Sequence, residues 1–155
     1  MRIGVESGAA LETRHQCLRT ARHVLGADDE MMVAVGTEHG WPSSGMLFAE
    51  AGQVPWMMIA AAAMAAPKLA FSTGIAVAFA RNPMNLAQIA WDLQAYSEGR
   101  FMLGLGSQIK PHITKRFSME WSKPAARMRE MVLAMHAIWD AWNDGTRLDF
   151  RGEFY

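Results

Sequence analysis

The chain has 155 residues, of which 51% are hydrophobic and 19% are charged, and these proportions are typical of a globular domain with a core of its own. Its 15 basic residues equal its 15 acidic residues, so the net charge points to neither nucleic acid nor an anionic membrane surface as a partner. The single cysteine, Cys17, excludes an internal disulfide and a zinc site built from cysteines, and it fits the reducing cytoplasm in which we expect the protein.

The first 57 residues carry weak signals for secondary structure. Helical spacing of apolar residues predicts a helix over Ala10–Gly26, and Met31–Val35 has the composition of a short buried strand. Gly36–Gly45 is rich in turn residues. The apolar run Val54–Pro67 is shorter than the roughly 20 residues of a membrane span, so it predicts a buried helix. No apolar stretch follows Arg2, which argues against a secretory signal.

From Lys68 onward the pattern is that of a strand, a helix and a second strand. Lys68–Phe79 is apolar on both faces, as in a parallel sheet, and Gly74 interrupts it in the manner of a bulge. Asn82 and Pro83 are suited to begin a helix that ends near Ser97, before Gly99. Phe101–Gly106 then predicts a second buried strand. Such a unit has parallel strands and a right-handed crossover.

The clearest helix of the sequence follows, beginning at Pro124 and ending at Gly145. Its apolar residues form one wide stripe: Met128, Met131, Val132, Met135, Ile138, Trp139 and Trp142. The alternation of apolar and charged residues in Thr146–Tyr155 predicts the start of an edge strand.

Several strings in this part of the chain resemble one family. "RNPMNLAQIAWDLQAYSEGRFMLGLG" is similar to a pattern of the luciferase-like flavin monooxygenase superfamily. "GSQIKPH" and "DFRGEFY" resemble the mycobacterial-type members that are thought to use the deazaflavin F420. The resemblance covers about Pro67–Tyr155, and its strength lies in the combination of these strings, since "GLG" alone is common.

The resemblance implies an α/β fold, the (β/α)8 TIM barrel. Such barrels need about 250 residues, so we expect a single incomplete barrel over residues 1–155, with roughly the first four strands and their helices. Residues 60–155 are family-like, whereas residues 1–57 match poorly, with Glu38 and His39 as a faint echo of a family turn. A disturbed reading frame upstream of about Ala60 is one explanation, and a fragment of a longer protein is our expectation.

The resemblance also implies where the site lies, because the functional residues of these barrels follow the carboxyl ends of the strands. Thr73, Gly74 and Ile75 form one such end and are predicted to bind the cofactor. The family often has a non-prolyl cis peptide here, and Gly74–Ile75 is the matching bond. A glycine without Cβ can approach the face of a ring, although Gly74 can equally be an ordinary strand glycine.

The second strand end is predicted to supply both cofactor-binding and catalytic residues. Gly106 allows the chain to turn, and Ser107 and Gln108 can donate hydrogen bonds to the cofactor. Lys110 can pair with an anionic group and His112 can transfer a proton near neutral pH. The alternative is a solvated loop in which Lys110 and Pro111 only make the turn.

The leading hypothesis is a luciferase-like oxidoreductase that acts on a small organic substrate, either by oxygenation or by F420-dependent hydride transfer. F420 is preferred over FMN on the resemblance alone. The main alternative is an inactive half-barrel stabilised by self-association, since half a barrel exposes strand edges and we expect a homo-oligomer. A free nucleotide-binding module is disfavoured, because "GLGSQIK" lacks a third glycine and no helix is expected to start there. The five histidines have no metal-site spacing, and no Gly-x-Ser-x-Gly occurs.

Overall fold

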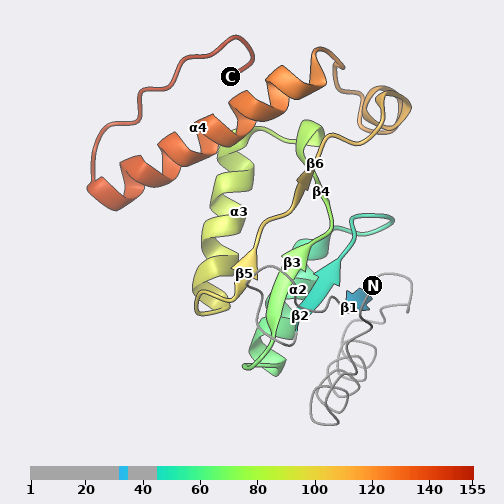
Figure 1. The fold of residues 1–155 in the computed structure, drawn as a ribbon, viewed down its shortest axis with the longest axis vertical. Coiled ribbons are helices and arrows are strands. Elements are labelled where there is room, and N and C mark those ends of the chain that lie inside the picture. Colours follow the sequence, from blue (N-terminus) through green and yellow to red (C-terminus); the bar gives the residue numbers. More distant parts are fainter. Residues whose placement is uncertain (1–31, 35–44) are drawn as a thin grey trace, which may run out of the picture. The chain divides into compact units, whose positions relative to one another are not determined.

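The computed structural model describes residues 32–34 and 45–155, and Figure 1 shows them as a coloured ribbon. They divide into two compact units. The first unit contains the described residues up to Ile75 together with Leu93–Gly104, and the second contains Ala76–Asp92 and Leu105–Tyr155. The helix predicted over Ala10–Gly26, residues 36–44 of the predicted turn segment and the residues Glu38 and His39 lie outside the described part of the chain.

The first unit is built on a sheet with the strand order β1-β2-β3-β5. Its strands are β1 (Met32–Ala34), β2 (Gly45–Phe48), β3 (Ala70–Thr73) and β5 (Phe101–Met102). β3 is parallel to both neighbours, β2 and β5, which confirms the parallel pairing expected from the strand–helix–strand pattern. β1 is a strand, as predicted, but it pairs with β2 in the antiparallel direction, unlike the strands of an all-parallel barrel.

The core of the first unit lies between this sheet and the helix α2 (Pro55–Ala65). Phe48 and Phe71 are fully buried, with ring centroids 6.5 Å apart, and Ile59 of α2 is also fully buried. The prediction of a helix here is confirmed, but its burial is one-sided. Met57 and Met64 face solvent, with 72% and 76% of their surface exposed. The packed face consists of Pro55, Met58, Ile59, Ala62 and Ala63.

Arg100 ties α2 to the strands of the first unit. Its guanidinium donates to the carbonyls of Ala63, Ala66 and Leu69 and lies over the ring of Phe71, 5.4 Å from the centroid. These are the last carbonyls of α2 and of the turn that follows it, so the arginine satisfies groups that a helix end leaves without partners. Arg100 therefore caps the C-terminal end of α2.

The helix α3 (Pro83–Tyr96) begins and ends where the sequence predicted. The backbone N–H of Asn85 donates to Oδ1 of Asn82 over 2.8 Å, which is the expected N-cap. At the other end Gly99 has a φ of 82° and donates its N–H to Gln94, a C-terminal geometry that favours glycine.

The second unit contains a short parallel pair and the long helix. β4 (Ala76–Val77) pairs with β6 (Leu105–Gly106), with Val77 opposite Gly106. The 3-10 turn η2 (Ala78–Ala80) follows β4, and η3 (His112–Arg116) comes after β6. The helix α4 (Pro124–Asp144) begins at the predicted proline and ends at Gly145, whose φ is 64°.

α4 packs against the first turns of α3 with a face narrower than the predicted stripe. Trp139 donates from Nε1 to the carbonyl of Ala87 over 3.1 Å. The buried residues of α4 are Met131, Ala134, Met135, Ile138 and Ala141. Val132 and Trp142, which were predicted in the stripe, are 37% and 38% exposed. Helical periodicity predicts which residues share one face of a helix. The width of the face that becomes buried depends on the element that packs against it.

Three strand predictions need correction. Lys68–Phe79 and Phe101–Gly106 each form two short strands rather than one, because Gly74 and the Leu103–Gly104 pair interrupt them. Met102 is 49% exposed, so the second segment is not buried throughout. The predicted edge strand in Thr146–Tyr155 is wrong: this segment has no strand and is held by side chains of α4 instead. Among the described residues, no helix has the length and apolar character needed to cross a membrane.

Candidate functional site

The first candidate strand end, Thr73–Ile75, lies in the first unit. The Gly74–Ile75 peptide bond is cis, which confirms the expectation drawn from the family pattern. The N–H of Gly74 donates to the carbonyl of Phe48 over 2.8 Å, and the carbonyl of Ile75 accepts from the N–H of Glu50 over 3.4 Å. Main-chain contacts with the β2 strand and the loop after it therefore fix this end of β3.

The space beside Gly74 is filled by a protein side chain. A Cβ at this position would overlap three carbons of Leu47. A glycine here was expected to let a cofactor ring approach, whereas in the structure the Cβ direction is filled by Leu47. Leu47 was missed by the sequence reasoning, since it lies 27 residues earlier (74 minus 47) in a segment without a clear signal.

Thr73 uses its hydroxyl inside the protein. Oγ1 donates to the carbonyl of Gly104 over 2.8 Å and accepts from the N–H of Gly104 over 2.9 Å, and the residue is 1% exposed. Gly104 has no room for a side chain, because a Cβ would overlap the carbonyl oxygen of Thr73. The pair joins the end of β3 to the break between β5 and β6, where the strand pairing is interrupted. The cofactor role of Thr73 stays a prediction.

The second candidate strand end, Gly106–His112, lies in the second unit and follows β6. Gly106 is the last residue of this strand, and the residue that turns the chain is Gln108, with a φ of 60°. The prediction that Gly106 makes the turn is therefore wrong. The hydroxyl of Ser107 donates to the carbonyl of Gln108 over 3.1 Å. A helical turn begins at Lys110 and continues as η3, so the expectation that no helix starts here is also wrong.

Gln108 and His112 are brought together by this turn. The Nδ1 atom of His112 lies 3.1 Å from Oε1 of Gln108. Because an amide oxygen only accepts, Nδ1 carries the proton, and in the neutral ring Nε2 is then the basic atom. His112 is exposed, and none of the described residues hydrogen-bonds to its Nε2. Among the predicted site residues, this pair is the one whose side chains contact each other directly.

The segment that follows β6 is strongly basic. Lys110, Lys115 and Arg116 lie within residues 107–117, and this stretch contains no carboxylate side chain. Lys110 and Lys115 are exposed, and the carbonyl of Lys110 accepts from the Thr114 hydroxyl over 3.0 Å, which closes the turn. A cluster of cations in a stretch of sequence that contributes no carboxylate favours the binding of an anionic group.

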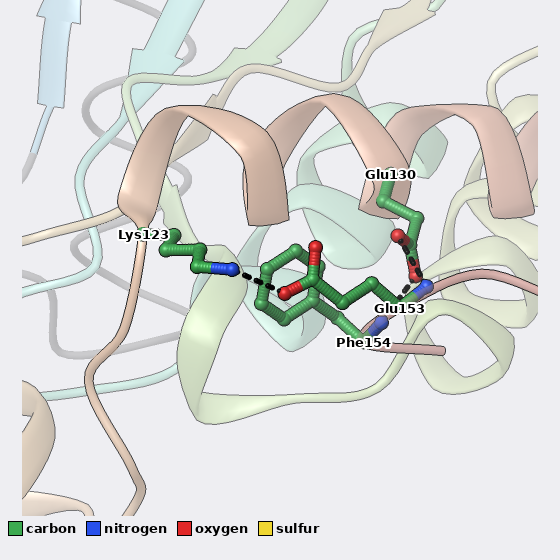
Figure 2. A network of polar contacts seen from close by, with 4 residues as sticks. All are labelled: Lys123, Glu130, Glu153 and Phe154. Carbon is green, nitrogen blue, oxygen red and sulfur yellow. Dashed lines mark hydrogen bonds and ion pairs between the residues drawn. The ribbon is translucent and has the colours of Figure 1, made fainter.

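A polar network that the sequence did not reveal joins α4 to residues 152–155 (Figure 2). The carboxylate of Glu130 accepts from the backbone N–H groups of Glu153, Phe154 and Tyr155 over 2.8, 2.6 and 2.7 Å. A Cβ on Gly152 would overlap this carboxylate. Desolvation raises the pKa of Glu130, but the three N–H donors together outweigh it and hold the pKa below its ordinary value.

Arg127 stands beside this network and contacts aromatic rings on two sides. Its guanidinium lies 4.8 Å from the ring centroid of Phe79 and 5.7 Å from that of Tyr155, and Nε donates to the Tyr155 hydroxyl. Phe79 also packs edge-to-face on Trp121. The arginine therefore connects the turn after β4 with the C-terminal segment within the second unit. No local pattern in the sequence signals these contacts, because the partners lie far apart along the chain.

Residues 24–155 match the family model described as luciferase-like monooxygenase. The chain belongs to this family. The match begins at residue 24, well before Pro67, where the resemblance in the sequence was taken to begin.

Mycobacterial relatives cover part of the chain. The uncharacterized protein Rv1360 of Mycobacterium tuberculosis is 56% identical over 120 residues, which are 77% of this chain and 34% of the relative. A phthiodiolone/phenolphthiodiolone dimycocerosates ketoreductase of Mycobacterium sp. (strain JLS) is 33% identical over 89 residues, 56% of this chain and 23% of the relative. The chain thus spans about a third of the length of the first of these relatives.

Two solved structures share the fold. The monooxygenase RslO1 from Streptomyces bottropensis has a TM-score of 0.55 and 25% identity, over 60% of this chain and 31% of that one. The second structure is the oxygenating constituent of 3,6-diketocamphane monooxygenase from Pseudomonas putida, a type II Baeyer–Villiger monooxygenase in complex with FMN. It has a TM-score of 0.63 and 20% identity, over 100% of this chain and 41% of that one. The α/β arrangement with parallel strands is therefore that of part of a luciferase-like barrel.

Proposed function

We propose that this luciferase-like chain binds a reduced flavin-type cofactor, F420 in preference to FMN, and carries the proton-transfer residue of an oxidoreductase. The observation that carries the proposal is the basic, carboxylate-free segment that follows the parallel pair β4 and β6. Ligands of barrel folds bind at the carboxyl ends of parallel strands. A cofactor with negative charges therefore fits the chemistry of residues 107–117.

The residues divide into two proposed roles. Gly106, Ser107 and Gln108, which end and follow β6, would contact the cofactor. For Thr73, Gly74 and Ile75 the cofactor role is carried over from the family pattern alone, and it would use the main chain, since the Thr73 hydroxyl is bound to Gly104. Lys110 would pair with an anionic group of the cofactor, and His112 would transfer the proton. The Gln108–His112 hydrogen bond supports the second role. It fixes the imidazole ring through Nδ1, so Nε2 points away from Gln108, the ring's partner among the described residues.

The proposed substrate is a small organic molecule with a ketone carbonyl, by analogy with the relative named as a ketoreductase. Reduction of a ketone to an alcohol needs two electrons and two protons. The reduced cofactor, when bound, supplies a hydride, which accounts for both electrons and one proton. His112 in its imidazolium form donates the second proton from Nε2 to the carbonyl oxygen, and the ring returns to the neutral tautomer held by Gln108.

The test is a titration of the purified chain with F420 and, separately, with FMN, followed by cofactor fluorescence. We expect saturable binding that is tighter for F420 and weakens with added salt. Lys110→Ala should weaken it by about tenfold, the order expected for loss of one charge-assisted contact. Lys68→Ala is the matched control, since Lys68 is exposed and lies outside the basic segment.

Failure of both cofactors to bind would overturn this proposal and favour the alternative, an inactive half-barrel that self-associates. Equal effects of Lys110→Ala and Lys68→Ala would remove the specific role of Lys110. His112→Gln separates the two proposed roles: binding should persist, whereas ketone reduction in the presence of reduced F420 should be lost. Loss of binding in that variant would make His112 a binding residue instead.

A further inference from the structure

A hollow lies on the surface of the second unit, and none of the residues assigned above lines it. It has a volume of about 660 Å³, within the range of roughly 300–1,000 Å³ typical of small-molecule sites. The first turns of α3 and the C-terminal end of α4 line it: Asn85, Gln88, Ile89, Trp91, Asp92 and Trp142. Neither the proposed function nor the cofactor segment uses any of these side chains.

Two indole rings form the aromatic wall of the hollow. Trp91 and Trp142 meet edge-to-face, with centroids 5.3 Å apart and planes at 81°, and they are 41% and 38% exposed. The nearby hydrogen bond from Trp139 to the carbonyl of Ala87 joins the two helices and holds the wall in place. Exposed indole faces on a fixed support attract cations, and tryptophan does so more strongly than the other aromatic residues.

The charge of the lining selects the same class of ligand. Asp92 is the one charged residue of the lining, which contains no lysine, arginine or histidine. Its carboxylate has no hydrogen-bond or ion-pair partner among the described residues. An anion would meet an unneutralised carboxylate, and a bare metal ion would find only one charged ligand. No group of three or more metal-ligating side chains occurs in the described part. An organic cation satisfies both the carboxylate and the rings.

We propose that this hollow binds a small organic cation with an alkylammonium head group. The cationic head would lie against the Trp91 and Trp142 rings and be neutralised by Asp92, while the amides of Asn85 and Gln88 are placed to accept hydrogen bonds from a polar substituent. The inference is independent of the proposed oxidoreductase activity, because the two sets of residues do not overlap.

The experiment compares choline with its uncharged isostere, 3,3-dimethylbutan-1-ol, on the full 155-residue chain. Binding is followed through the indole N–H signals in two-dimensional NMR, where the chain has six tryptophans to report. Choline should shift the Trp91 and Trp142 signals saturably, identified with Trp91→Phe and Trp142→Phe variants. The isostere should bind on the order of tenfold more weakly, since it keeps the shape and loses the cation.

The carboxylate is tested with a matched pair of variants. Asp92→Asn should weaken choline binding about as much as removing the charge from the ligand does. Asp140→Asn, on the exposed side of α4 and outside the lining, should leave it unchanged. The chemical shifts of the remaining indoles check that each variant is folded. Equal binding of choline and the isostere, an unaltered affinity in Asp92→Asn, or no shift of either indole would each overturn the proposal.

Discussion

The Thr73 hydroxyl shows how one side chain can replace part of a sheet. It occupies the position between β3 and the break at Gly104, where two main-chain groups would otherwise lack partners. Buried polar groups without hydrogen bonds are costly, so the contact contributes to stability whatever else Thr73 does. A hydroxyl that is satisfied on both sides is a poor donor to a ligand. The first-unit strand end therefore offers a cofactor its main chain more readily than its side chains.

At the residue scale, the prediction concerns Thr73→Val. The valine keeps the shape of the side chain and removes both hydrogen bonds. The N–H and the carbonyl of Gly104 then lose their partner, next to a residue of which only 1% is exposed. We expect a loss of about 1–3 kcal/mol in the free energy of unfolding, measured by urea denaturation. Thr73→Ser keeps the hydroxyl and should lose much less. Similar losses in the two variants would show that the methyl group, not the hydroxyl, stabilises this strand end.

At the scale of elements, the helix boundaries could be predicted because their signals are local. Asn82 and Pro83 begin α3, and Asn82 forms its N-cap. Gly99 and Gly145 follow the helix ends in left-handed conformations, which glycine adopts readily at helix C-termini. The Thr146–Tyr155 segment was mispredicted for the opposite reason. Its partner is Glu130, more than 20 positions earlier, and alternation within the segment carries no information about a carboxylate on another element.

The C-terminal segment should respond to pH through Glu130. The pKa of this carboxyl is lower in the folded chain than its ordinary value, so its contribution to stability is complete at pH above that ordinary, unfolded-state pKa. The contribution is lost as the pH falls through the lower folded-state pKa. Amide NMR signals of Glu153, Phe154 and Tyr155 should therefore show protection from solvent exchange near neutral pH and lose it in acid.

Glu130→Gln tests the same contact without changing the pH. An amide presents one accepting oxygen and adds donors that face the three N–H groups, so protection of these amides should fall. Glu98→Gln is the control, since Glu98 is exposed and lies in the first unit. If the Glu130 variant keeps full protection, the Lys123–Glu153 ion pair and the Arg127 contacts hold the segment instead.

At the scale of the whole molecule, the site could be predicted only in part. The family pattern led to the cis bond at Gly74–Ile75, and the basic segment can be read directly from the sequence. The partner of Gly74 is Leu47 and that of Thr73 is Gly104, and both contacts depend on how distant segments pack. The spacing of residues along a chain does not encode such contacts. Only the structure therefore shows which predicted site residues are already engaged by other parts of the protein.

The expected self-association of the chain can be tested at an exposed strand edge. Among the described strands, β5 is at one edge of the first-unit sheet, and its Met102 is 49% exposed. A charged residue on an edge strand disfavours pairing with a second copy. Met102→Lys should therefore shift the chain toward monomer in size-exclusion chromatography with light scattering. Met64→Lys, on the exposed side of α2, should not, and a chain that is already monomeric would contradict the expectation.

The carboxylate of Glu130 has a consequence for how this chain can vary. Its three acceptor contacts are all made to amide groups of the polypeptide itself, which every residue except proline possesses. Evolution can therefore exchange the side chains at 153–155 with little effect on this attachment, as long as proline is avoided. Gly152 has no such freedom, because any larger residue would collide with the acid.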